Sequence, residues 1–169
     1  DGASGLMIPH VSTPEKAKSL VDATKFPPVG DRGIDGAGLD NGFNLFDDDY
    51  PARTNAETFL VVQIETPEAV ANVDAIAATP GVDGLFIGTG DLGFRLKQSE
   101  EHPSLEEAIE IVAAAAKKHN KAWGCPAGSA DAIRQRRGQG AQLLARGGDA
   151  GALIQTLGQW QTELDEIFD

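Results

Sequence analysis

Residues 59–68, Phe-Leu-Val-Val-Gln-Ile-Glu-Thr-Pro-Glu, decide the fold class of this chain. The run from Phe59 to Ile64 is apolar on both faces except for Gln63, and it predicts a strand that is buried on both sides. Thr66-Pro67-Glu68 follows at once and is typical of a helix start, with a capping hydroxyl and a proline in the first turn. A buried strand that runs directly into a helix indicates a β-α unit of a parallel sheet.

The same pattern recurs along the chain. Met7 to Glu15 (MIPHVSTPE) resembles Leu60 to Glu68 (LVVQIETPE), and Ser104 to Glu107 is a capping box that opens a helix to about Lys118. The predicted strands are residues 5–8, 59–64, 82–87, 121–124 and 141–145, with further helices near 129–137 and up to 168. Polar or Gly-rich residues follow all five strands, which favours a (β/α)8 TIM barrel over a doubly wound sheet that gathers its ligand at one crevice.

Five strands do not close an eight-stranded barrel, which needs roughly 250 residues. We therefore expect residues 1–169 to be the C-terminal part of a single α/β barrel domain, carrying about the last five β-α units, with the earlier units preceding Asp1. Between about Lys25 and Thr58 the sequence shows turn residues and acidic clusters with little periodicity, and it predicts a long loop.

Charge and composition exclude several classes of function. The formal net charge of −12 argues against a nucleic-acid partner, because phosphate binding needs a basic surface. The one basic cluster, Arg134, Arg136 and Arg137, is interpreted as a solvated helix face. No apolar run approaches the roughly 20 residues of a membrane span, so no membrane partner is expected. A single cysteine, Cys125, fits a reducing, cytoplasmic compartment.

Two carboxylates follow neighbouring predicted strands. Glu65 and Asp91 are 26 positions apart, close to the length of one β-α unit, so both are expected at the same rim of the sheet. Two adjacent carboxylates repel each other unless a cation or a shared proton intervenes, and Mg²⁺ takes one or two carboxylates while keeping open positions. The alternative is that both residues are helix N-caps, where carboxylates are also stabilised.

Other polar groups lie at the same predicted rim. Gln63 is on the same side of its strand as Glu65, where its amide either bonds a substrate carbonyl or is satisfied within the barrel. The backbone N–H groups of Gly88-Thr89-Gly90 suit an anionic carboxylate. His10 follows a strand and is placed to face the site, whereas His102 is expected in a loop. His119 and Cys125 are better explained as structural, the first at a helix C-terminus and the second as buried filler.

At these residues the chain resembles the HpcH/HpaI aldolase family, which includes 2-dehydro-3-deoxyglucarate and 4-hydroxy-2-oxoheptanedioate aldolases. The segments that carry the resemblance are residues 1–11, 26–33, 62–66, 72–76 and 82–92. The resemblance implies a class II pyruvate aldolase on a (β/α)8 barrel, with Glu65 and Asp91 as metal ligands and Gln63 in contact with substrate. It also implies that Gly90 and Asp91 belong to the turn that holds the pyruvate carboxylate.

The chain departs from the family pattern at one motif. Members usually read Gly-Pro-Ala-Asp-Leu-Ser, and this chain has Gly-Thr-Gly-Asp-Leu-Gly over residues 88–93, a change expected to alter the pocket while keeping the ligand Asp91. The general-base His and the pyruvate-clamping Arg of the family belong to its N-terminal third, so they are expected before Asp1.

The function predicted from the sequence is that of a metal-dependent carbon–carbon lyase. It would cleave a 4-hydroxy-2-oxo acid to pyruvate, or a related 2-oxo acid, plus an aldehyde, using Mg²⁺, Mn²⁺ or another divalent metal. Two alternatives stay open: a non-catalytic acid-binding or assembly barrel, and an isomerase whose Gly147-Gly148 turn binds phosphate. An apolar stripe at Trp160, Leu164, Ile167 and Phe168 fits either a homo-oligomer contact, as family members make, or packing on its own barrel.

Overall fold

The computed structural model describes residues 2–35, 43, 47–98 and 103–168. Within them, five parallel strands form one sheet in the order β1-β2-β3-β4-β5. The strands are β1 (Gly5–Ile8), β2 (Phe59–Ile64), β3 (Gly84–Ile87), β4 (Ala122–Pro126) and β5 (Leu143–Ala145). The sequential order contains no reversal, so it is the order of a barrel and not of a doubly wound sheet.

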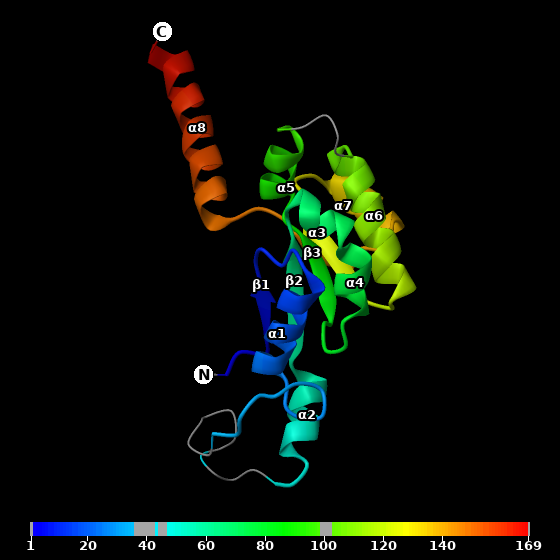
Figure 1. The fold of residues 1–169 in the computed structure, drawn as a ribbon. Coiled ribbons are helices and arrows are strands. Elements are labelled where there is room, and N and C mark those ends of the chain that lie inside the picture. Colours follow the sequence, from blue (N-terminus) through cyan, green and yellow to red (C-terminus); the bar gives the residue numbers. More distant parts are fainter. Residues whose placement is uncertain (1, 36–42, 44–46, 99–102, 169) are drawn as a thin grey trace.

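Helices connect the strands, and most of them cover one face of the sheet, while the last extends away from it (Figure 1). They are α1 (Pro14–Thr24), α2 (Tyr50–Glu57), α3 (Pro67–Ala71), α4 (Val73–Ala78), α5 (Thr89–Leu96), α6 (Leu105–Lys118), α7 (Ala130–Gly138) and α8 (Asp149–Phe168). The predicted α/β class is confirmed as a curled parallel half-barrel of five strands. The predicted total of eight β-α units stays a prediction.

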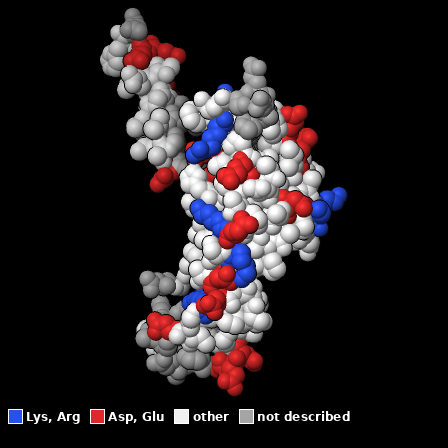
Figure 2. Space-filling view, in the orientation of Figure 1, with Lys and Arg blue, Asp and Glu red and all other residues white. Residues whose placement is uncertain are grey.

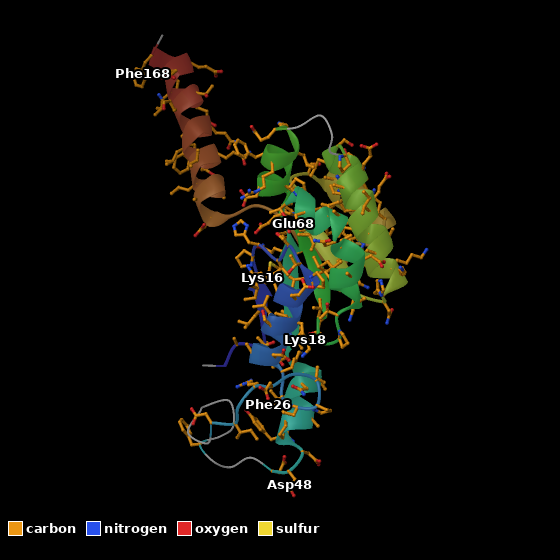
Figure 3. All side chains as sticks on the ribbon, viewed as in Figure 1. Lys16, Lys18, Phe26, Asp48, Glu68 and Phe168 are labelled. Atoms are coloured by element: carbon orange, nitrogen blue, oxygen red, sulfur yellow. The ribbon has the colours of Figure 1, made fainter. Side chains whose placement is uncertain are left out.

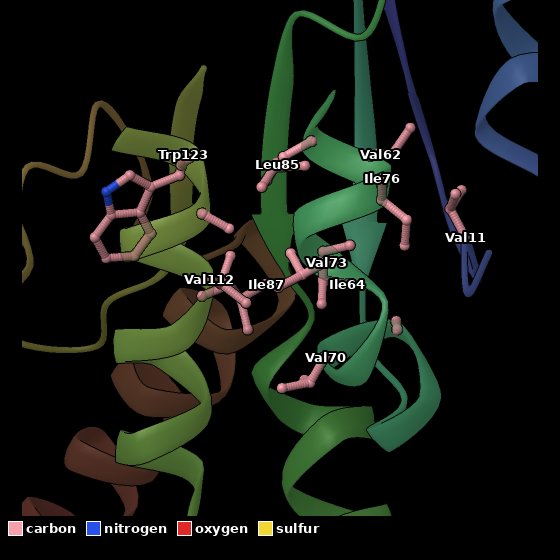
Figure 4. Packing of buried hydrophobic residues seen from close by; sticks show 14 of the residues in the cluster. Val11, Val62, Ile64, Val70, Val73, Ile76, Leu85, Ile87, Val112 and Trp123 are labelled. Atoms are coloured by element: carbon pink, nitrogen blue, oxygen red, sulfur yellow. The ribbon is translucent and has the colours of Figure 1, made fainter. Parts of the chain in front are cut away.

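The core lies between the sheet and its covering helices (Figure 4). Alternate residues of β2, namely Leu60, Val62 and Ile64, are fully buried and face this core. Val73 and Ile76 of α4 pack against them, as do side chains from α6 and β4. The intervening β2 residues point to the other, concave face, where Phe59 is exposed and Gln63 is half-buried. This alternation places Gln63 on the concave side of the sheet.

The helix starts that the sequence predicts are present. Thr13 and Thr66 accept hydrogen bonds from the backbone N–H groups of Lys16 and Ala69. Ser104 forms a complete capping box with Glu107, and the hydrogen bonds from Ser104 lower the pKa of the Glu107 carboxyl. The caps at Thr13 and Thr66 fix the points at which the chain turns from β1 and β2 into the following helices.

Two features differ from the predictions. The connection between Lys25 and Thr58 contains helix α2, which was expected to be loop; Tyr50 is buried there against the ring of Phe26, with 5.6 Å between ring centroids. Arg136 is buried, not solvated, because its guanidinium makes a two-bond contact with Glu106 of α6 (2.8 and 2.5 Å). Both depend on contacts between segments about 25 to 30 residues apart, which local periodicity does not reveal.

Lys25 fastens the segment around α2 to the amino-terminal end of the sheet. Its side chain is 3% exposed, and its Nζ donates to the carbonyl oxygens of Asn55 (3.1 Å) and Thr58. The same ammonium lies 3.1 Å from Oδ2 of Asp83, which in turn accepts from the backbone N–H of Leu60 (2.7 Å). One buried charge therefore joins α1, α2 and the loop before β3.

Replacing Lys25 by Met is expected to lower the free energy of unfolding by about 2 kcal/mol. The change removes the donor to two carbonyl oxygens and the partner of one carboxylate. The matched control is Lys18→Met, which removes an exposed ion pair with Asp22 and is expected to change stability by less than about 0.5 kcal/mol. Urea titration of both variants measures the difference; equal midpoints would contradict this role of Lys25.

Candidate metal centre

Three potential metal ligands meet at the carboxyl-terminal end of the sheet. His10 follows β1, Glu65 follows β2, and Asp91 lies in the first turn of α5, which follows β3. These strands are neighbours, paired in parallel through Ile8 with Val62 and Ile64 with Ile87. One donor atom from each of the three side chains lies within 4.8 Å of the other two. The predicted approach of Glu65 and Asp91 is therefore what the register of the strands produces.

Glu65 is the buried member of the group, with 5% of its surface exposed. Its Oε1 accepts a hydrogen bond from the backbone N–H of His10 (2.7 Å) and lies 3.3 Å from the ring Nδ1 of the same residue. His10 and Asp91 are exposed, so the group opens to solvent on one side. A buried carboxylate that faces an open, polar mouth is well placed to bind a cation from solution.

The loop after β1 bends to reach Glu65. His10 adopts a left-handed backbone conformation, with φ of 55°, which non-glycine residues rarely take. Its carbonyl oxygen accepts from Nζ of Lys16 (2.8 Å), which lies near the start of α1 (Figure 3). On the next residue, the backbone N–H of Val11 bonds the carbonyl of Gln63 (3.3 Å). These bonds hold the loop against β2 and keep His10 beside the carboxylate.

Gly88 leaves room for the Glu65 carboxylate. A Cβ at position 88 would lie 2.5 Å from Oε2 and 2.8 Å from Cβ of Glu65, which is inside van der Waals contact. The backbone N–H of Gly88 also bonds the carbonyl of Ile64 (3.1 Å), so the end of β3 is tied directly to the end of β2. Only a residue without a side chain at position 88 leaves the Glu65 carboxylate the space that it occupies.

The interpretation of the two carboxylates as N-caps is wrong. Thr66, not Glu65, caps α3, and Gly88, not Asp91, is the N-cap residue of α5. Asp91 does lie in the first turn of α5, where the helix dipole stabilises a negative charge. The Glu65 carboxylate does not cap a helix; it contacts His10 and lies close to the Asp91 carboxylate.

The remaining predicted site residues surround this group. Gln63 shares the concave side with Glu65, and its amide nitrogen lies 3.5 Å from Sδ of Met7, a weak acceptor. Thr89 and Gly90 form the first turn of α5, and no atom within 4 Å would obstruct a Cβ at Gly90. The substrate contacts expected for Gln63, Gly88, Thr89, Gly90 and Asp91 stay predictions.

The other polar residues singled out in the sequence lie elsewhere. Cys125 is fully buried in β4, and burial is the largest effect on its thiol, raising the pKa above its ordinary value. His119 is the C-cap residue of α6 and pairs with Asp74 (3.0 Å), and hydrogen bonds from Lys118 and His119 lower the pKa of the Asp74 carboxyl. Both structural interpretations are confirmed, while His102 lies outside the described residues.

The donor set fits a divalent cation. Two carboxylates and an imidazole from three adjacent strand ends supply oxygen and nitrogen ligands and leave the exposed side free for water or substrate oxygens. Sequence reasoning found Glu65 and Asp91 but did not include His10 as a ligand. Pro9-His10 directly after the first predicted strand was the available signal, because that strand is the neighbour of β2.

Comparisons with known proteins identify the family and the fold of the chain. The family model described as HpcH/HpaI aldolase/citrate lyase matches residues 1–156. The 5-keto-4-deoxy-D-glucarate aldolase of Salmonella gallinarum is 39% identical over 153 residues, covering 89% of this chain and 59% of the relative. The crystal structure of an HpcH/HpaI aldolase from Desulfitobacterium hafniense has a TM-score of 0.87 at 31% identity, over 98% of this chain and 65% of that one.

A structure of an HpcH/HpaI aldolase/citrate lyase family protein from Burkholderia cenocepacia gives a TM-score of 0.83 at 37% identity, over 97% of this chain and 66% of that one. The fold is an α/β half-barrel that matches part of each of these structures. The chain belongs to the HpcH/HpaI aldolase/citrate lyase family, and it spans 59% of the length of the curated relatives that it matches.

Replacing Gly88 by Ala is expected to weaken the binding of Mn²⁺ at least about tenfold, because the added methyl group displaces the Glu65 carboxylate. Gly93→Ala is the matched control in the same helix, since a Cβ there meets only Leu105 at an ordinary 3.6 Å. Isothermal titration with Mn²⁺ measures both variants. Unchanged affinity in Gly88→Ala would contradict the role of this glycine in positioning Glu65.

Proposed function

We propose that the protein acts as a divalent-metal-dependent lyase that cleaves a 4-hydroxy-2-oxo acid to pyruvate, or a related 2-oxo acid, and an aldehyde. The observation that carries the proposal is the meeting of Glu65 and Asp91 at one end of the sheet, with His10 beside them. Membership of an aldolase/citrate lyase family supports the reaction class. The relatives named as aldolases favour this reaction over a non-catalytic barrel or a phosphate-binding isomerase.

The proposed centre holds Mg²⁺ or Mn²⁺ between Glu65 and Asp91. The cation would supply Lewis acidity that stabilises negative charge on the 2-oxo oxygen of the substrate. Glu65 is suited to anchor it because its carboxylate is buried and fixed by the His10 N–H and by Gly88. Asp91, at the open side, completes the pair without closing the site.

The substrate is proposed to lie on the concave face, against β2 and the first turn of α5. Gln63 offers an amide donor there, two positions before Glu65, to the 2-oxo group or the adjacent carboxylate. The backbone N–H groups at the start of α5, from Thr89 to Asp91, face the substrate carboxylate with the positive end of the helix dipole. In cleavage a general base takes the proton of the 4-hydroxyl group, the C3–C4 bond breaks to release the aldehyde, and its electron pair forms the enolate of the 2-oxo acid, which then takes up a proton at C3.

Replacing Glu65 by Gln is expected to reduce metal-dependent turnover at least about 100-fold, because the neutral amide no longer holds the cation. The assay follows exchange of solvent deuterium into the methyl group of pyruvate by NMR, with and without EDTA. Glu68→Gln is the matched control: it removes the same charge three positions away, on an exposed side chain (Figure 3). Undiminished exchange in Glu65→Gln would rule out the ligand role.

We also propose that helix α8 packs on a second copy of the chain. In the part of the protein that the structure describes, α8 has no buried residue and extends away from the body (Figure 1). Its large apolar side chains are exposed, among them Leu157, Trp160 and Leu164, which share one stripe. Residues 150–162 carry no charge, and charged side chains gather toward the two ends of the helix (Figure 2). A helix of this kind is typical of a subunit contact.

Replacing Leu157 by Glu is expected to reduce the mass of the assembly in solution, because it places a charge within the apolar stripe. Gln155→Glu adds the same charge on the opposite side of the helix and is expected to leave the mass unchanged. Size-exclusion chromatography with light scattering compares the two. A monomeric parent protein, or an unchanged mass for Leu157→Glu, would contradict the proposed contact.

Among the described helices, none combines the length and the apolar character that crossing a bilayer requires.

A further inference from the structure

His10 is not among the metal ligands that the family pattern implies, yet the structure places it in the same group. Its ring offers a donor atom within 4.8 Å of the donor atoms of both Glu65 and Asp91. The ring Nδ1 lies 3.3 Å from Oε1 of Glu65. Two ligands at adjacent positions around an ion with bonds of about 2.1 Å are separated by roughly 3 Å, so this spacing suits two ligands of one ion.

The backbone at His10 is shaped for this placement. A left-handed conformation is unfavourable for a non-glycine residue, and it persists here while the carboxylate of Glu65 and the ammonium of Lys16 bind the two sides of the residue. The Lys16 side chain donates to the His10 carbonyl, while the His10 N–H donates to Glu65. Strained residues held in this way concentrate at functional sites.

The ring is accessible while its neighbour is not. The side chain of His10 is 52% exposed, whereas that of Glu65 is 6% exposed. A histidine that served only to fill space beside the carboxylate would be expected to be buried with it. An exposed imidazole at the mouth of a site, with one nitrogen against a buried carboxylate, is instead placed to meet an ion that enters from solvent.

We infer that His10 is a third protein ligand of the cation, so that the centre has one nitrogen and two carboxylate oxygens and prefers transition metals such as Mn²⁺ and Co²⁺ to Mg²⁺. Imidazole binds first-row transition ions well, whereas Mg²⁺ strongly prefers oxygen. Three ligands from the segments that follow β1, β2 and β3 would leave the remaining positions for water and the substrate. The inference rests on the proposed centre at Glu65 and Asp91 and adds the choice of metal.

The direct test is pulsed electron paramagnetic resonance of the wild-type protein loaded with Mn²⁺, without substrate. A bound imidazole is expected to give a ¹⁴N hyperfine coupling that is present in wild type and lost in His10→Gly. Glycine is the preferred replacement because it keeps the left-handed backbone without strain and supplies no ligand. His119→Ala, which removes the histidine paired with Asp74, is the control and is expected to keep the coupling.

Titration calorimetry supplies the second readout. Wild type is expected to bind Co²⁺ at least about tenfold more tightly than Mg²⁺, and His10→Gly is expected to lose at least about tenfold in Co²⁺ affinity and less than about threefold in Mg²⁺ affinity. Mn²⁺ bound by wild type without nitrogen coupling overturns the role of His10 but leaves Glu65 and Asp91 as ligands. No binding of any of the three ions by wild type overturns the proposed centre itself.

Discussion

The carboxylate of Glu65, buried at the end of β2, is the group on which the arrangement of the site depends. The strand before it is buried on its helix-facing side, and the backbone N–H of His10 holds Oε1 of this side chain. The neighbouring strand ends adjust to it: the loop after β1 turns to offer the His10 N–H, and β3 is followed by Gly88, where a Cβ would collide with Oε2. A negative charge kept in such a position is stabilised best by a positive ion in front of it.

Much of the fold, and the pairing of Glu65 with Asp91, could be predicted from the sequence because the patterns that indicate them are local. Short runs of neighbouring residues encode strand β2, the Thr66 cap and the capping box at Ser104. The meeting of Glu65 and Asp91 follows from strand adjacency and a spacing of one β-α unit. The sequence did not predict α2, the burial of Arg136 or the contact of His10 with Glu65, since each depends on a partner that lies far along the chain.

The chain carries Glu65 and Asp91 as the acids of the proposed centre, and it departs from the family motif in the turn that contains Asp91. Family members usually carry proline at the second position of the Gly-Pro-Ala-Asp motif, and this chain carries Thr89, the first residue of α5. Threonine restores a backbone N–H that proline lacks, and Gly90 leaves its surroundings open. The start of α5 therefore differs from the family motif in one backbone donor, while the overall fold matches the related structures with TM-scores of 0.83 and 0.87.

The most direct measurement of the central claim is an anomalous-scattering map from crystals soaked in Mn²⁺. The account predicts one strong peak at the carboxyl-terminal end of the sheet, bonded at about 2.2 Å to an oxygen of Glu65 and an oxygen of Asp91. A map with no peak there at saturating Mn²⁺, or with the ion bound by only one of the two carboxylates, would contradict it.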